Sequence, residues 1–327
     1  MYIVTGGAGF IGSNLVAALS ARQEEVVVCD WMGQDERWRN LVRHEIAGLI
    51  EPEKLPLFLE DRKKAVRAVV HMGAISATTE RNIDLIAERN IRSTLQLIDW
   101  CTREDKPLIY ASSAATYGDG AGGFDDDASP EALARLKPLN AYGWSKHVVD
   151  RHVARLKARG VKLPPQIVGL KFFNVYGPNE YHKGSMKSVI AQNYPRVAAG
   201  EPIRLFRSRN PNYADGGQLR DFIYVRDCVE AILWLLANPA ISGLFNLGSG
   251  KARSWLDLAK ALCRAAGKDD KISFIDMPAE LADSYQYLTQ ARMEKLRAAG
   301  FTRPMTPLEE GVEDYVCNFL MRKDPYL

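Results

Sequence analysis

Tyr142 and Lys146 lie four residues apart in the chain, in the segment Ala-Tyr-Gly-Trp-Ser-Lys. On a helix this spacing places both side chains on one face, one turn apart. A neighbouring ammonium lowers the pKa of a phenol, which is ordinarily about 10, because it favours the phenolate. A shift of roughly 3 units, or about 4 kcal/mol, would bring the phenol close to neutrality. The pair is therefore a candidate proton-transfer centre for alcohol oxidation, although the pattern also suits a surface helix with a half-buried tyrosine and a solvated lysine.

A glycine-rich segment near the start of the chain follows a short apolar run. Residues 2–5 read Tyr-Ile-Val-Thr, and Gly6-x-x-Gly9-x-x-Gly12 comes next, ahead of a helical pattern of apolar residues. This is the context of a dinucleotide fingerprint, in which glycines allow the tight turn, the approach of a pyrophosphate and the packing of helix on strand. The helix N-terminus adds N–H donors for the phosphates. We therefore expect cofactor contacts from Gly6, Gly9, Phe10, Ile11 and Gly12.

An acidic residue ends the next strand-like run. Asp30 lies 18 residues after Gly12, close to the position at which a carboxylate binds an adenosine ribose. Asp30 alone would favour NAD. Arg37 and Arg39 follow soon after and could accept a 2′-phosphate, which would favour NADP, or they could be solvated loop residues.

Strand-like and helical patterns alternate through the first half of the chain. Strand-like runs at 68–71, 108–111 and 166–172 are separated by helical patterns at about 85–103 and 141–159. This alternation favours an α/β fold, a doubly wound parallel sheet of the Rossmann type with a smaller C-terminal α/β substrate lobe. A chain of 327 residues suits two domains, or one large α/β domain with a smaller lobe. We expect a dinucleotide-binding domain at 1–178 and a substrate domain at 179–327, with some strands and helices exchanged between them.

Residues just past the carboxyl ends of parallel strands line the ligand crevice of such a sheet. The residues behind the strand at 68–71 are Met72, Gly73, Ala74, Ile75 and Ser76, and we expect them to contact the cofactor. His71 itself is more typical of a packed residue at a strand end than of a catalyst. Ser113 follows the strand at 108–111, and its hydroxyl could bind a substrate alkoxide or cap a turn.

The second half of the chain brings basic residues to predicted strand ends. Lys183, Arg207 and Arg220 are so placed. An arginine fork matches phosphate oxygens, so the pattern suits a diphosphate. Scattered solvated charge is the alternative for any one of them.

Composition narrows the classes of partner. The net charge of +3 gives no reason to expect nucleic acid, and no apolar run is long enough to span a bilayer. The five cysteines are scattered without Cys-x-x-Cys spacing, which favours a reducing cytoplasm over a disulfide framework or zinc site. The five histidines form no His-x-x-x-His pair, and we expect no metal site.

These motifs together resemble the extended short-chain dehydrogenase/reductase family, the nucleotide-sugar modifiers, over essentially the whole chain. The resemblance is carried by the glycine loop, Ser113, Tyr142-x-x-x-Lys146, Phe-Asn-Val-Tyr-Gly-Pro at 173–178 and Arg-Asp-Phe at 220–222. Residues 110–118, 181–186 and 245–250 are most similar to the branch of the family that epimerises C6 of ADP-heptose, since the common 4-epimerases lack the run His-Lys-Gly-Ser-Met at 182–186. The resemblance implies bound NADP, an ADP-glycero-manno-heptose substrate from lipopolysaccharide core synthesis, and a homo-oligomer, expected as a homopentamer.

The resemblance also implies roles for individual residues. Lys146 would bind the nicotinamide ribose and tune Tyr142, and Ser113 would hold the reacting oxygen. Further cofactor contacts would come from Asp30, Trp31, Arg37, Asn90, Tyr142, Lys146 and Val175. The substrate would be bound by Ser113, Asn174, Lys183, Ser185, Phe206, Arg207, Ser208, Arg209, Arg220 and Tyr285.

Epimerisation of an unactivated alcohol carbon suits transient oxidation, because direct deprotonation there is hard. A cofactor takes hydride, leaves a ketone and returns hydride to the opposite face. At an exocyclic carbon, rotation about one bond presents that face, and the oxygen then needs a second acid/base. We assign Tyr142 to one orientation and Lys183 to the other. A phosphate-binding or surface lysine is the alternative for Lys183, whose loss of charge would be favoured by partial burial.

Particular residues bear on the cofactor, the sugar and the alternative functions. Trp31 stands where the family usually has a small polar residue, which weakens the argument for NADP over NAD. Residues 210–218 form an insertion beside the expected substrate-binding arginines, which could alter the fit of the sugar. A C4 epimerase of a UDP-hexose remains an alternative enzyme. A sugar 4,6-dehydratase is disfavoured because Ala114 and Ala115 stand where elimination needs an acid. A non-catalytic NADP-binding regulator would not need Ser113, Tyr142 and Lys146.

Overall fold

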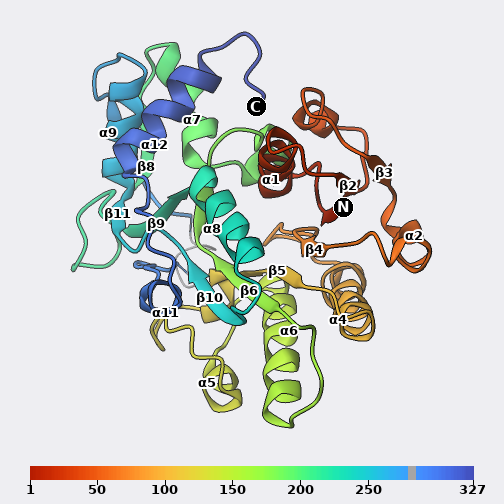
Figure 1. Cartoon of the computed structure of the whole chain (residues 1–327). Coiled ribbons are helices and arrows are strands. Elements are labelled where there is room, and N and C mark those ends of the chain that lie inside the picture. The colour runs from red at the N-terminus through yellow and green to blue at the C-terminus, as the bar shows by residue number, and fades with distance from the viewer. Residues whose placement is uncertain (279–284) are drawn as a thin grey trace.

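Within residues 1–278 and 285–327, which the computed structural model describes, seven parallel strands form a central sheet in the order β10-β6-β5-β4-β1-β2-β3 (Figure 1). The order reverses between β1 and β4, so that the sheet is doubly wound, as the sequence predicted. The strands are β1 (Tyr2–Thr5), β2 (Val26–Cys29), β3 (Gly48–Ile50), β4 (Ala68–His71), β5 (Leu108–Ser113), β6 (Ile167–Phe172) and β10 (Gly243–Leu247).

Both faces of the sheet are buried over most of its extent because most residues of its strands are apolar. Val4, Val28 and Val70 pack against one layer of helices, whereas their neighbours Ile3, Val27 and Val69 pack against the other. Alternate side chains of a strand point to opposite faces, which explains this division. The first layer holds α1 (Phe10–Ala21) and α8 (Val225–Ala237); the second holds α2 (Leu55–Arg62), α4 (Ser93–Arg103) and α6 (Ala141–Ala158).

One helix predicted at 85–103 is divided in the structure. It begins as α3 (Ile83–Ile86), continues as a π-helical segment at Ala87–Arg92 and ends as α4. The helical segment near the C-terminus is likewise divided, into α12 (Leu308–Tyr315) and a π-helical turn at Val316–Leu320. A π-helical turn has i→i+5 backbone hydrogen bonds in place of the i→i+4 bonds of an α-helix. The periodicity of apolar residues in the sequence does not reveal this change.

A second lobe, formed largely by the C-terminal half, has its own apolar core (Figure 1). Its strands form two small sheets, one in the order β11-β9-β7 and one of β12 and β8. Their bounds are β7 (Asn174–Tyr176), β8 (Ile203–Phe206), β9 (Leu219–Tyr224), β11 (Ala252–Ser254) and β12 (Ile272–Ile275). Further α-helices of the described residues are α5 (Pro130–Arg135), α7 (Val189–Ala198), α9 (Trp255–Ala265) and α11 (Glu294–Ala298).

The two lobes exchange elements along the chain. β10 and α8 come from the C-terminal half but complete the central sheet and its helical layer, while β7 pairs with β9 of the second lobe. The domain boundary at residue 178 stays a prediction. In the described part of the chain, we find no helix with the length and apolar character needed to cross a membrane.

Candidate active site

The carboxyl ends of β1, β4 and β5 open onto one cavity of ≈ 1860 Å³, which the second lobe also lines. This is roughly twice the upper end of the usual range for a small-ligand pocket. The volume therefore suits two ligands side by side better than one. Of the predicted site residues, those lining the cavity are Gly6, Gly9, Phe10, Ile11, Gly12, Asp30, Trp31, Arg37, Met72, Gly73, Ala74, Ile75, Ser76, Ser113, Tyr142, Lys146, Asn174, Val175, Lys183, Arg220 and Tyr285.

The glycine loop leads from β1 into the first turn of α1. Gly6 has φ +64, and a Cβ there would lie 2.6 Å from the Cα of Gly73. A Cβ on Gly12 would lie 2.0 Å from the carbonyl oxygen of Gly6. The described first turn of α1 carries no acidic residue, and its N-cap, Gly9, makes no side-chain bond. The first N–H groups of α1 thus receive no side-chain cap, and the loop, which lines the cavity, fits a dinucleotide pyrophosphate.

We expect Gly12→Ala to abolish dinucleotide binding, because its Cβ cannot be placed without moving the Gly6 carbonyl. Binding would be measured by the cofactor released on denaturing the purified protein and by calorimetric titration. Gly122→Ala is the matched control, since a Cβ there has no heavy atom within 4 Å. Equal cofactor content in both variants would contradict the assigned role of the loop.

The end of β2 carries an acidic residue beside a cluster of mixed charge. Asp30 Oδ2 accepts a hydrogen bond from the N–H of Ala8 at 3.0 Å, and Arg37 approaches Oδ1 at 3.8 Å. Burial raises the pKa of the Asp30 carboxyl, and the Ala8 N–H and Arg37 oppose that rise. Arg37 also forms hydrogen bonds to both carboxylate oxygens of Asp35. The carboxylate suits a ribose hydroxyl, and Arg37 lies beside it at the edge of the cavity.

Trp31 is fixed by two partners that the sequence did not suggest. Arg89 of the π-helical segment lies with its guanidinium 3.6 Å from the centre of the Trp31 ring. The indole N–H lies 2.9 and 3.0 Å from the two carboxylate oxygens of Glu53. Arg89 lines the cavity as well. The sequence analysis did not predict Arg89 as a site residue, because nothing in the residues around it indicates a contact with a residue as distant in the chain as Trp31.

Asn90 supports the cavity from behind, and among the described residues it is not one that lines it. Its side chain accepts a hydrogen bond from the N–H of Ile75 at 2.8 Å and donates to the Ile75 carbonyl at 2.9 Å. It also donates to Ser145 Oγ at 3.0 Å, and Ser145 donates to the Tyr142 carbonyl at 2.7 Å. The π-helical turn therefore ties the loop after β4 to the first turn of α6. The predicted direct contact of Asn90 with the cofactor stays a prediction.

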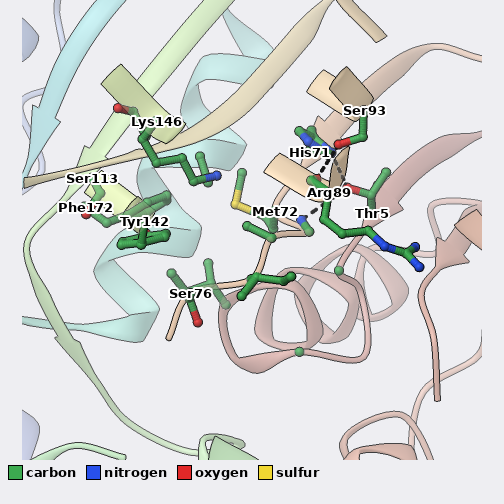
Figure 2. A pocket seen from close by; sticks show the side chains of 18 of the residues that line it. Thr5, His71, Met72, Ser76, Arg89, Ser93, Ser113, Tyr142, Lys146 and Phe172 are labelled. Carbon is green, nitrogen blue, oxygen red and sulfur yellow. Dashed lines mark hydrogen bonds between the residues drawn. The ribbon is translucent and has the colours of Figure 1, made fainter. Parts of the chain in front are cut away.

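Ser113, Tyr142 and Lys146 lie together beside the cavity. Figure 2 shows them on one side, with the Lys146 side chain extending towards Met72. The helix α6 starts at this point because Asn140 accepts a hydrogen bond from the N–H of Gly143 at 2.8 Å. A Cβ on Gly143 would lie 2.6 Å from the carbonyl oxygen of Ala115, so glycine allows α6 to approach the turn at Ala114–Tyr117, just after β5, closely.

The electrostatics of the pair differ from the expectation drawn from spacing. Burial raises the pKa of the Tyr142 phenol, and a hydrogen bond with Ser113 offsets that rise in part. Burial also lowers the pKa of Lys146 to about 8, against the attraction of Asp150. The expected lowering of the Tyr142 pKa by Lys146 is therefore wrong for this structure. Both groups are removed from water, which disfavours the charged form of each.

Lys183 faces the same cavity from the connection between the lobes. It lies in the turn Tyr181–Met186, where Gly184 has φ +54, and its Nζ is 5.2 Å from the centre of the Phe10 ring. Burial lowers the pKa of the Lys183 amine, and Glu180 opposes that change. Loss of its proton is thus easier than for a solvated lysine, as a second acid/base requires.

The turn that carries Lys183 is held by the last residues of the chain. Tyr181 donates a hydrogen bond to the carbonyl of Pro325 at 2.8 Å, and the Leu327 N–H donates to Asn179 at 3.0 Å. On the inner side, the buried Glu180 accepts a hydrogen bond from the Ser188 hydroxyl at 2.6 Å. These contacts fix both ends of the turn.

Arg220 is the buried cation of the second lobe. Its guanidinium lies 5.1 Å from the centre of the Tyr285 ring and 5.7 Å from that of Trp255. Burial lowers its pKa, and among residues 1–278 and 285–327 it forms no ion pair with a carboxylate. A buried arginine that lines a cavity suits a diphosphate ligand, because its guanidinium fork matches phosphate oxygens.

Five predicted substrate residues do not line the cavity in the part of the chain that the structure describes: Ser185, Phe206, Arg207, Ser208 and Arg209. Arg207 instead pairs with Asp276 at 3.3 Å, and Arg209 donates to the Met277 carbonyl at 2.9 Å. The inserted residues 210–218 pack beside them, with the ring of Tyr213 5.2 Å from that of Tyr287. The position of these residues at strand ends does not indicate such partners, and substrate contacts from the five residues stay predictions.

Gln286 and Thr289 also line the cavity. The sequence did not predict them, because neither residue lies in a recognisable motif.

A doubly wound sheet with a large cavity at its carboxyl edge is typical of enzymes that bind a dinucleotide, and comparison with known protein families identifies which of these the chain resembles. The model of the NAD dependent epimerase/dehydratase family matches residues 2–248. The chain therefore belongs to that family.

Individual relatives are more specific. The chain is 49% identical, over 100% of both chains, to a protein of Nitratidesulfovibrio vulgaris strain DP4 named ADP-L-glycero-D-manno-heptose-6-epimerase. A protein of Fusobacterium nucleatum with the same name is 43% identical, also over 100% of both chains. The crystal structure of the Helicobacter pylori ADP-L-glycero-D-manno-heptose-6-epimerase is similar, with a TM-score of 0.79, 28% identity and coverage of 97% of this chain and 95% of that chain.

Proposed function

We propose that this protein is an isomerase that inverts C6 of ADP-glycero-manno-heptose, from the D-glycero to the L-glycero configuration. The observation that carries the proposal is that Tyr142 and Lys183, from different lobes, line one cavity in a chain 49% identical to a full-length epimerase of that name. Arg220 would hold the diphosphate of the substrate. The excess volume of the cavity accommodates cofactor and nucleotide sugar together.

The residues of the chain divide the work of two half-reactions. When bound, the nicotinamide cofactor supplies reversible hydride transfer with the C6 carbon. Ser113 holds the reacting oxygen. Tyr142 takes the proton of the C6 hydroxyl when the alcohol is oxidised in one orientation, and Lys183 gives a proton to the C6 oxygen when the rotated ketone is reduced; the roles exchange in the reverse direction. The ketone stays in the cavity, so the redox change is reversed before release.

The direct test is to incubate the purified protein with ADP-D-glycero-D-manno-heptose and follow the C6 proton by NMR. We expect conversion to an equilibrium mixture of the two C6 epimers without added cofactor. UDP-glucose is the comparison substrate, since a Thermus thermophilus UDP-glucose 4-epimerase is similar in structure, with a TM-score of 0.73, 26% identity and coverage of 96% of this chain and 97% of that chain. Conversion of UDP-glucose without conversion of the heptose would favour the C4 alternative.

For the cofactor, a nicotinamide dinucleotide is supported by the family and by the glycine loop. We propose NADP, because Arg37 lines the cavity beside Asp30 and could bind a 2′-phosphate. The carboxylate of Asp30 works against that phosphate, and the balance between the two side chains decides the preference.

We expect Arg37→Met to weaken NADP binding by about tenfold or more, with NAD binding unchanged, because one charge-assisted contact to phosphate is worth about 1.5–3 kcal/mol. Arg39→Met is the matched control, since Arg39 lies over the Tyr326 ring and pairs with Asp324. Affinities would be measured by calorimetry on protein freed of nucleotide. A released native cofactor without a 2′-phosphate would contradict the choice of NADP.

We also propose a cytoplasmic homo-oligomer, with five copies expected, that supplies precursor for the lipopolysaccharide core. Four of the five cysteines are buried thiols, which suits a reducing compartment. Large apolar side chains such as Trp38, Val42 and Trp144 are exposed and could be covered between copies. Light scattering on the purified protein measures the number of copies.

A further inference from the structure

A buried ion pair lies directly behind the catalytic helix. Asp150 and Lys171 are both fully buried, and Lys171 Nζ lies 3.2 Å from Asp150 Oδ2. Asp150 is on α6, four residues after Lys146, and Lys171 is on β6. Tyr142, Lys146 and Asp150 thus follow one another at intervals of four residues along the helix face that meets the sheet.

The sheet is shaped to receive this carboxylate. The hydroxyl of Ser112 donates to Asp150 Oδ2 at 2.7 Å, and that of Tyr110 donates to Oδ1 at 3.1 Å. Ser112 is the register partner of Lys171, and Tyr110 that of Gly169. A Cβ on Gly169 would lie 2.5 Å from the Tyr110 hydroxyl oxygen, so the glycine makes room for that hydrogen bond.

The cation of the pair has few other contacts. Lys171 Nζ donates to Thr116 Oγ1 and lies 4.5 Å from the centre of the Tyr117 ring. Among the described residues, Lys146 forms no ion pair, and neither Asp150 nor Lys171 lines the cavity. Three charged groups therefore lie one behind another: the cation of Lys146 at the cavity, the buried anion of Asp150 behind it, and the buried cation of Lys171 behind the anion.

We propose that Asp150 and Lys171 are positioning residues that set the charge of Lys146, Asp150 by favouring the ammonium and Lys171 by limiting that effect. A charge in a layer without water acts over a longer range than at the surface. The Asp150 carboxylate attracts both the Lys146 and the Lys171 ammonium groups. The Lys171 charge partly cancels the stabilisation that Asp150 gives to the ammonium form of Lys146. This inference rests on the proposed function for the role of Lys146, but the charge of Lys146 is measurable without any substrate.

Other titratable groups near Lys146 stay fixed in charge over the working range. Burial lowers the pKa of His71, on β4, to about 3, and that of His147, beside Lys146 on α6, to about 4, so both are neutral at pH 7. Burial raises the pKa values of Tyr110 and Tyr117, which stay protonated, and it also raises that of Tyr142. Asp126 and Lys295 also act on Lys171, with opposite signs. Lys146, with its pKa lowered to about 8 by burial, is the group whose charge these neighbours can change near neutrality.

The test titrates Lys146 by NMR in the full-length protein, with 13C in the lysine Cε positions and the signal assigned by its loss in Lys146→Met. We expect the midpoint to rise by about 1 unit in Lys171→Met, because Asp150 then acts on Lys146 alone, and to fall by about 1 unit in Asp150→Asn. In the double variant the midpoint should lie below the native one and above that of Asp150→Asn, because the nearer anion and the farther cation are both lost.

Two controls separate charge from packing. Ser112→Ala removes a hydrogen bond to Asp150 without changing a charge, and Lys171→Arg keeps the cation; neither should move the Lys146 midpoint by more than about 0.3 unit. Folding of each variant is checked by circular dichroism. Unchanged midpoints, or shifts of one sign in Lys171→Met and Asp150→Asn, would overturn the inference. If a single variant does not fold, a midpoint in the double variant at or above the native one would also overturn it.

Activity is the second measurement. If the cationic form of Lys146 is required, activity falls as the pH rises through its midpoint, at higher pH in Lys171→Met and at lower pH in Asp150→Asn. The two readouts distinguish the proposals: the expected NMR order without any conversion of the heptose by the native protein would leave the inference standing and remove the proposed function.

Discussion

Tyr142→Phe is expected to lose C6 epimerisation by about 10²- to 10⁴-fold, the usual contribution of a general acid/base. The substitution removes one oxygen and keeps the ring, which is half-buried beside Ser113. Folding and cofactor binding should therefore be unchanged. The measurement is conversion of each C6 epimer, together with absorbance at about 340 nm, which reports reduced nicotinamide.

A more specific expectation concerns which of the two C6 epimers the variant can still oxidise. If Tyr142 serves one orientation of the substrate, Tyr142→Phe should block oxidation starting from one epimer and leave the first oxidation of the other epimer detectable as bound, reduced cofactor. Trp144→Phe is a matched control, because Trp144 is an exposed aromatic residue on the same helix and does not line the cavity in the described structure. Full activity of Tyr142→Phe with both epimers would show that this phenol is not the proton-transfer group.

Lys183→Met is expected to show the complementary loss. It should block oxidation of the epimer that Tyr142→Phe still oxidises, and lower overall epimerisation by about 10²-fold or more. Methionine keeps the length and apolar stem of the side chain over Phe10, so the turn at Tyr181–Met186 should keep its conformation. The measurement is again cofactor reduction by each epimer in a single turnover.

Lys187→Met is the control for Lys183→Met, since Lys187 follows the same turn and does not line the cavity among the described residues. Two results would count against two-base catalysis. One is full activity of Lys183→Met; the other is loss of oxidation of the same epimer in both Lys183→Met and Tyr142→Phe. A lysine that only bound phosphate would instead weaken substrate binding equally for the two epimers.

The sequence predicted the central sheet and the motifs around its edge because their signals are local. Apolar runs marked β1, β4, β5 and β6, and glycine spacing marked the turn between β1 and α1. Residues after strands then meet at one edge for topological reasons, which explains why Met72 and Ser113 line the same cavity.

What the sequence could not give depends on contacts between distant segments. Arg89 lies over Trp31, and Lys171 pairs with Asp150, although nothing near any of these residues specifies the partner. The expected lowering of the Tyr142 pKa was wrong because spacing reports neighbours but not the loss of water around them. Arg207 followed the strand-end rule, yet its charge pairs with Asp276 instead of facing the cavity.

Gly169 has a consequence for protein engineering and for the evolution of this sheet. Its missing Cβ gives space to the Tyr110 hydroxyl, so the two positions cannot vary independently. Alanine at 169 would require a residue smaller than phenylalanine at 110, because its Cβ would also lie 2.6 Å from the ring Cζ of Tyr110, and the buried carboxylate of Asp150 would then lose a donor. A directed-evolution library that randomises β6 should therefore recover substitutions at 169 paired with changes at 110, and among homologues the two positions should covary.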